Sequence, residues 1–230
     1  MNEVLLDNMK FELDLSSLMK KVRLTENNRR YDSFVKFLNE AYSVSRPKAI
    51  YKSLYIDKKD NDSVTMEGAV FKSRILAVNL AEVNRVFAFV VTCGTELDQW
   101  GKKREKMLEE YWADIIMQCV LFEAIDIMKK DIVDNFNPGK LAFMNPGSLQ
   151  EWSLEEQQTL FSVFHDVQKS IGVQINPECI MTPRHSVSGI FFPAKVDYEN
   201  CRLCPREQCP GRRAPYDKDL YDKHYSIKTP

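Results

Sequence analysis

The chain has 230 residues, 44% of them hydrophobic and 28% charged, which is the balance of an ordinary soluble protein with room for one large domain and a small appendage. Its formal net charge of −1 excludes a general electrostatic attraction to nucleic acid or to anionic membranes. The absence of a long apolar run and of a signal-peptide pattern predicts a cytoplasmic protein without a membrane span, in which thiols stay reduced.

The first segment, residues 1–47, is predicted to be helical. Arg46 precedes Pro47, and the residue before a proline is pushed out of the helical region, so the segment is expected to end there. Apolar residues recur at helical spacing in two stretches: Leu15, Leu18, Met19 and Val22, then Tyr31, Phe34, Leu38 and Tyr42.

Two apolar runs then predict strands. Residues 50–56 form a β-rich stretch before the polar turn at 58–62. Residues 86–91 are rich in Val and Phe and end at Thr92-Cys93-Gly94, which is typical of a buried strand. Cys93 is therefore expected to serve packing.

Residues 95–136 are predicted to form the longest helical region, closed by Pro138-Gly139. Its second half is apolar almost all round, which predicts a buried helix, with Cys119 as a small hydrophobe inside it. Ser153 and Glu156 then make a capping-box pattern at the start of a helix that Gly172 follows. Short β-like runs fill residues 173–192, so the fold class is α+β with helices around a sheet.

The three histidines are expected to be exposed: His165 on a solvated helix face, His185 and His224 in polar surroundings. No nucleophilic triad, paired-carboxylate site, phosphate-binding loop or dinucleotide fingerprint is evident. The sequence therefore does not predict a complete enzyme.

The tail carries Cys201, Cys204 and Cys209 in the spacing C-x2-C-x4-C. Thiolates at this spacing can converge on one metal centre, and both iron–sulfur clusters and zinc use such loops. Cys179 is the first candidate for a fourth ligand. Three readings stay open: an iron–sulfur cluster that carries an electron, a zinc ion that staples the tail, or three free thiols.

Two motifs carry a family resemblance. Asn145-Pro146-Gly147-Ser148, followed by a tryptophan and a helix start, and the Ser-Val-Ser-Gly run at 186–189 resemble the reactivation domain of cobalamin-dependent methionine synthase and its stand-alone, corrinoid-associated relatives. The resemblance covers about residues 48–195. The tail resembles one found in the stand-alone members. It implies three parts: a helical segment (1–47), an activation-domain-like α+β domain with a largely antiparallel sheet (48–195) and a cysteine-rich metal-binding tail (196–230).

The resemblance implies an accessory role in methyl transfer. A protein of this kind docks on a cobalamin-carrying partner, an electron donor reduces the inactive cob(II)alamin, and S-adenosylmethionine supplies the methyl group that traps the product. The tail's arginines are diluted by acidic residues, so no nucleic-acid partner is expected. The ligand- or partner-binding surface would comprise Asn145, Pro146, Gly147, Ser148, Ser186, Val187, Ser188 and Gly189.

Three positions depart from the family's S-adenosylmethionine pocket. Phe143 stands where the family has an arginine, and Ser148 and Phe191 stand where it has tyrosines. A phenylalanine cannot pair with a carboxylate as an arginine does, so weak or no S-adenosylmethionine binding is predicted. The alternatives are a non-enzymatic interaction protein with a structural zinc knuckle, or an S-adenosylmethionine-binding protein with a rearranged pocket.

Overall fold

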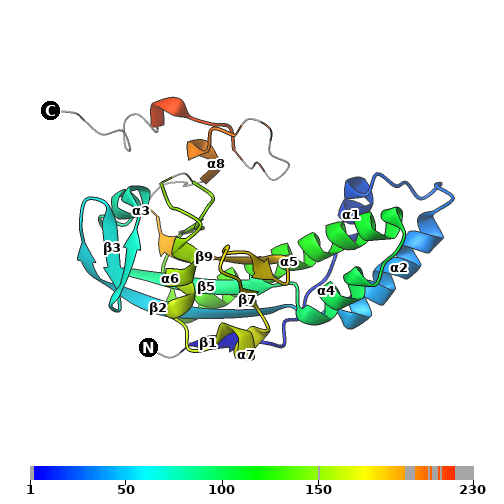
Figure 1. Cartoon of the computed structure of the whole chain (residues 1–230). Helices are drawn as coiled ribbons and strands as arrows, with labels where there is room; N and C mark the ends of the chain where they lie inside the picture. Colours follow the sequence, from blue (N-terminus) through cyan, green and yellow to red (C-terminus); the bar gives the residue numbers. More distant parts are fainter. Residues whose placement is uncertain are drawn as a thin grey trace.

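A curled antiparallel sheet forms the middle layer of the computed structural model, which describes residues 3–149, 151–194, 200–206, 208, 212 and 214–220 (Figure 1). Its order is β4-β3-β2-β5-β9-β6, with β1 also paired to β2, and every pairing is antiparallel. This confirms the predicted α+β class. The strands are β1 (Val4–Leu6), β2 (Lys48–Lys59), β3 (Ser63–Met66), β4 (Ala69–Lys72), β5 (Arg85–Thr92), β6 (Leu141–Met144) and β9 (Ser186–Pro193), and a separate hairpin pairs β7 (Gln174–Ile175) with β8 (Met181–Thr182).

Helices cover both faces of the sheet and enclose two apolar cores. Figure 1 shows the longest helix running along one face, with α1 and α2 beside its far end. On that face lie α1 (Leu15–Lys21), α2 (Tyr31–Val44), α4 (Thr95–Lys102) and α5 (Met107–Phe136); on the other lie α3 (Arg74–Asn79), α6 (Glu156–Ser162), α7 (Val167–Ile171) and the tail helix α8 (Asn200–Leu203). Among the described helices, none is long and apolar enough to cross a membrane.

Strand β5 belongs to both cores, which confirms the predicted buried strand. Successive side chains of a strand point to opposite faces, so Phe87, Phe89 and Val91 enter the core under α5. Val86, Ala88 and Val90 enter the core under α6 and α7. The apolar run 86–91 therefore has no polar side because neither of its sides meets water.

The N-terminal prediction was wrong in one respect. Val4, Leu5 and Leu6 form β1 opposite Tyr51, Ile50 and Ala49 of β2, whereas residues 1–47 were expected to be helical. The three residues pair with a strand that lies more than forty positions away in sequence. Helical periodicity within a segment does not predict such long-range pairing. The two helical stretches themselves are confirmed as α1 and α2.

The predicted helix 95–136 is two helices. α4 ends at Lys102 and α5 begins at Met107. The linking residues 103–106 are all charged and offer the core no apolar side chain, and Arg104 turns back to donate to the carbonyl of Trp100 at 3.2 Å. The predicted end of α5 is confirmed, because Asn137 adopts a left-handed conformation (φ 42°) directly before Pro138.

The predicted capping box is also absent. The Ser153 hydroxyl donates to the Glu155 carboxylate at 2.8 Å, and α6 starts at Glu156 with no side-chain cap. The expected single helix is divided in two. The second piece, α7, has its own cap, since the Asp166 carboxylate accepts from the Lys169 amide at 2.9 Å, and Gly172 ends it at φ 77°.

Candidate functional site

The two segments that carry the family resemblance lie against each other. Asn145 follows β6 and its side-chain amide donates to the carbonyl of Ser188 in β9 at 2.7 Å. Gly189 makes this approach possible, because a Cβ there would lie 2.4 Å from the Met144 carbonyl oxygen and 2.6 Å from Asn145 Nδ2. A larger residue at position 189 would push the Asn145 turn off the sheet.

The Pro-Gly turn is fixed by its own hydrogen bonds. Gly147 has φ 76°, a conformation that favours glycine, and its amide donates to the Trp152 carbonyl at 2.8 Å. The Ser148 amide and hydroxyl both donate to the Asn145 carbonyl, at 3.2 and 2.6 Å. Trp152 is fully buried beneath the turn. The turn therefore presents the Ser148 hydroxyl as an acceptor at a fixed position.

Two residues that the sequence did not predict complete a buried polar cluster. Gln157 of α6 donates through Nε2 to the Ser188 hydroxyl at 2.8 Å, and Asn200 of α8 donates through Nδ2 to the Ser148 hydroxyl at 3.1 Å. Gln157 and Asn200 are 3% and 6% exposed, so this predicted surface is a largely enclosed polar site. Within the described part of the chain, neither amide oxygen has a hydrogen-bond partner.

The remaining predicted positions divide between the two faces of the sheet. Ser186 is buried and its hydroxyl donates to the Pro183 carbonyl at 2.7 Å. Val187 packs against the core beneath α5, and no hydrogen bond of its side chain is possible there. Pro146 is buried within the turn. Ser188 and Gly189 are thus the β9 residues that the structure places at the turn.

Phe143 and Phe191 pack against each other and not into an open pocket. Their ring centroids lie 5.7 Å apart, and Phe191 stacks on Phe89 at 4.6 Å. Phe191 is fully buried. The two aromatic substitutions therefore serve the core under α5, where a charged or polar anchor would lose its hydration.

The tail cysteines are partly placed. Cys201 lies in α8 and Cys204 just after it, both half-buried, and Cys209 lies outside the described residues. Cys179 is buried near the β7–β8 hairpin, where it accepts from Gln158 Nε2 at 3.6 Å. Among the described residues, no three potential metal ligands cluster, so the structure does not join Cys179 to Cys201 and Cys204.

Arg212 organises the cysteine loop, a role that the sequence did not suggest. Its guanidinium donates to the carbonyls of Cys201 at 3.0 Å, Cys204 at 3.1 Å and Ala214 at 2.9 Å, and also to that of Arg206. Arginine suits this role because its planar group offers five donors in fixed directions. Four carbonyls of the described tail residues therefore converge on one cation.

His185, next to the start of β9, was predicted to be exposed, and this prediction was wrong. Its side chain is only 12% exposed and its Nε2 lies 3.2 Å from Asp114 Oδ1, and Arg184 pairs with the same carboxylate. Burial lowers the pKa of His185, and the charge of Asp114 opposes that shift. His165 is exposed as predicted, but it lies between α6 and α7 and not on a helix, and His224 lies outside the described residues. Cys93 and Cys119 are buried, which confirms their packing role; burial raises the pKa of the Cys93 thiol to about 12.

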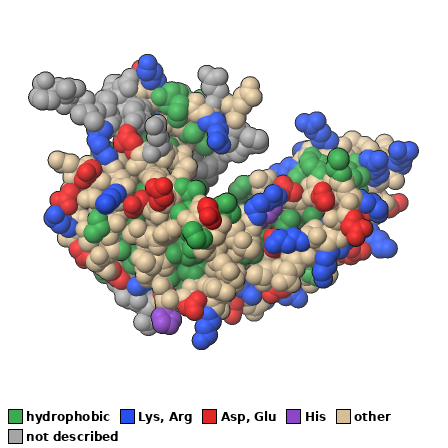
Figure 2. Space-filling model, in the orientation of Figure 1, with side chains coloured by type: hydrophobic (Ala, Val, Ile, Leu, Met, Phe, Trp, Pro, Cys, Tyr) green, Lys and Arg blue, Asp and Glu red, His purple; other side chains and the backbone are tan. Residues whose placement is uncertain are grey.

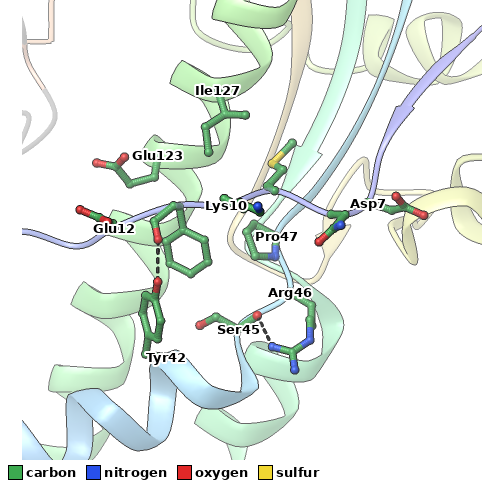
Figure 3. A pocket seen from close by; sticks show the side chains of 12 residues that line it. Asp7, Lys10, Glu12, Tyr42, Ser45, Arg46, Pro47, Glu123 and Ile127 are labelled. Atoms are coloured by element: carbon green, nitrogen blue, oxygen red, sulfur yellow. Dashed lines mark hydrogen bonds between the residues drawn. The ribbon is translucent and has the colours of Figure 1, made fainter.

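A groove of about 850 Å³ opens on a different part of the molecule, between residues 7–12, the end of α2 and α5 (Figure 3). Tyr42 donates to the Phe11 carbonyl at 2.7 Å, and Arg46 donates to the Ser45 carbonyl at 2.7 Å. The lining mixes acidic and basic side chains, and Arg46 is committed to the end of α2. No residue of the predicted site lines this groove.

Figure 2 shows a second concave face, the hollow between the tail and the arm formed by α1 and α5. Hydrophobic side chains gather along part of it. At the start of α5, Met107 and Tyr111 are 85% and 44% exposed, and the Tyr111 hydroxyl donates to the Lys21 carbonyl at the end of α1 at 3.1 Å.

No known family model matches the chain, and no curated protein resembles it in sequence. Among solved structures, the fold is similar to the crystal structure of the MetH reactivation domain bound to AdoHcy, with a TM-score of 0.60 and 12% sequence identity. The likeness covers 83% of this chain and 73% of that one. At this identity it establishes the fold, which matches the α+β prediction, and function has to be argued from the site.

Proposed function

We propose that this chain is an activation-domain-like accessory protein that assists the reductive reactivation of a corrinoid protein in a methyl-transfer system. The observation that carries the proposal is the fold likeness to a reactivation domain over 83% of the chain. It is supported by the contact between Asn145 and Ser188, which brings together the two motifs that resemble that family. The partner is a cobalamin-carrying protein, and the chain contributes a docking surface and not a complete active site.

The tail is proposed to hold a metal through Cys201, Cys204 and Cys209. The two described thiols fit a metal centre, because they lie close together in the chain at the end of α8 and are both half-buried. Arg212 fixes the carbonyls of both residues, which holds the loop in shape before ligation. An iron–sulfur cluster there would supply one-electron transfer, and a zinc ion would supply only structure.

An S-adenosyl ligand is a weaker part of the proposal. The structural neighbour was solved with AdoHcy, but Phe143 and Phe191 are packed into the aromatic core here. Without these polar anchors we expect the chain to bind S-adenosylmethionine weakly or not at all. Calorimetric titration that gave micromolar or tighter binding would contradict this expectation.

The metal is tested by anaerobic purification, metal analysis and visible spectroscopy. We expect iron and labile sulfide that are lost in Cys204→Ala and retained in the matched variant Cys119→Ala, whose thiol is buried in the core. Colourless protein with one zinc would support the alternative, a structural knuckle in a non-enzymatic interaction protein. Protein that contains no metal and cannot be reconstituted would contradict both the iron–sulfur and the zinc interpretation of the tail.

The corrinoid role is tested by mixing the purified chain with a cob(II)alamin-loaded corrinoid protein, a reductant and a methyl donor. Return of the methylated cofactor, followed by its visible spectrum, should be faster with the chain than without it. A chain that neither binds the corrinoid protein nor changes its reduction or methylation would contradict the proposed function.

A further inference from the structure

The tail contacts the turn that the sequence predicts to belong to the ligand- or partner-binding surface. Leu203 of α8 is 3% exposed and lies in the same core as Leu149 and Trp152. Cys204 and Leu220 pack partly against that core, and Asn200 reaches the Ser148 hydroxyl at 3.1 Å. The tail therefore contacts the Ser148 side of the Pro-Gly turn and leaves Gly147 exposed.

The tail is also cross-linked within itself. Arg202 pairs with Asp217 through side chains at 2.7 Å, and the Asp217 amide donates to the Arg202 carbonyl at 2.8 Å. The Arg212 guanidinium donates hydrogen bonds to the carbonyls of Cys201 and Cys204. These bonds join residues within the tail. Among the described residues, its contacts with the body include the Asn200–Ser148 hydrogen bond and the packing of Leu203, Cys204 and Leu220 on the core. The described tail is therefore held together by bonds of its own as well as by contacts with the body.

The polar contact beneath the tail is only half satisfied. Asn200 uses its amide nitrogen on Ser148, while its oxygen and that of Gln157 are buried without a partner among the described residues. Buried acceptors without donors oppose the packed state. Asn200 therefore holds the docked tail through its amide nitrogen, while its oxygen, buried without a partner among the described residues, disfavours the same position.

From these observations we propose that the tail (described residues 200–206, 208, 212 and 214–220) is a latch that competes with the docking partner for the Asn145–Ser148 turn. The inference rests on the proposed function for the partner's identity. The group that replaces the latch carries hydrogen-bond donors, as an amide or an ammonium does, because it meets the acceptors Ser148 Oγ and Gln157 Oε1. Partner docking and latch docking exclude each other.

The latch itself is tested by hydrogen–deuterium exchange on the full chain. Leu203→Asp should undock the tail and speed exchange at the amides of Gly147, Ser148 and Trp152 at least tenfold, with β5 unchanged. Asn200→Ala, a milder change, should act in the same direction. The control is Ile180→Asp, which adds the same charge at a side chain that is 59% exposed. Unchanged exchange at the turn in both tail variants overturns the latch.

Competition is tested by titrating the same proteins with an isolated cobalamin-binding domain. Leu203→Asp and Asn200→Ala should bind at least fivefold more tightly than the unmodified chain, and Ile180→Asp should bind equally. Binding that is unchanged or weaker in both tail variants overturns the competition. If no form of the chain binds the domain, the proposed function has failed, and the exchange experiment alone decides whether the tail is a latch.

Discussion

At the scale of single residues, Gly189 explains why the two motifs can meet. It sits in the middle of β9 opposite Phe89, in a position where a side chain would collide with the Met144 carbonyl and with Asn145. Backbone atoms cannot move aside as a flexible side chain can. The glycine is therefore required by packing and not by turn geometry.

Replacing Gly189 by alanine should lower the free energy of unfolding by ~1–3 kcal/mol, since overpacking against fixed backbone is destabilising. Urea denaturation measures the change. The control is Gly101→Ala in α4, where the new Cβ would meet the flexible end of Met117 at 2.9 Å and where alanine favours the helix. Equal losses in the two variants would show that the Asn145 contact is not tight.

The buried His185 should make stability depend on pH. Burial lowers its pKa below the ordinary value of 6.5, so the unfolded chain takes up the proton first. The stabilisation is complete above about pH 6.5 and is lost as the pH falls from there toward the lowered pKa. His185→Asn should flatten the fall in the urea midpoint between pH 7.5 and 5.5, and the exposed His165→Asn should not. An unaltered slope in His185→Asn would contradict the assignment.

At the scale of elements, local patterns predicted α1, α2, β5, the body of α5 and the short β-like runs of residues 173–192. Their signals lie within the segment itself, as periodicity or as an apolar run. The sequence missed β1 because its pairing with β2 is non-local. It missed the break after Lys102 because charged residues suit an exposed helix and a linker equally well.

Helix α7 offers an element-scale test of capping. Asp166→Ala removes the acceptor of the Lys169 amide and should cost about 0.5–2 kcal/mol of stability. Glu155→Ala serves as the matched control, since Glu155 occupies the cap position of α6 without a side-chain cap bond. Thermal unfolding compares the two. A loss in Glu155→Ala as large as that in Asp166→Ala would mean that the capping bond is not the cause.

The candidate site was predicted in its parts but not in its assembly. The Pro-Gly turn and Ser188 were predicted from motifs, and the structure joins them. Gln157 and Asn200 carry no local sign of burial, because their partners, Ser188 and Ser148, lie 31 and 52 positions away along the chain. Amide side chains look alike in sequence whether they face water or a buried hydroxyl. The burial of these two side chains could therefore be established only from the structure.

At the scale of the whole molecule, two cores share one strand. The core under α5 contains Trp100 and Trp112, and the core under α6 contains Trp152. Because β5 contributes side chains to both, neither core can open without disturbing the other. We infer that the described body unfolds as one cooperative unit.

Tryptophan fluorescence can test this coupling. Trp152→Phe leaves reporters in the first core, and the double variant Trp100→Phe, Trp112→Phe leaves one in the second. Within each variant, the urea midpoint from fluorescence should equal the midpoint from far-ultraviolet circular dichroism. Comparing probes inside one variant removes the effect of the substitutions on overall stability. A fluorescence transition that precedes the circular dichroism transition in either variant would show that the cores unfold separately.

The burial of β5 on both sides has a consequence for how β9 finds its place. A shift of one residue in the register of a strand normally moves its apolar side chains from the core to the solvent face, which costs stability. Between β5 and the apolar half of β9, a slip would still place apolar side chains in both cores. Gly189 resolves the ambiguity, since only a residue without a side chain fits between Phe89 and Asn145. The register of β9 against β5 is therefore set by a position that accepts only glycine.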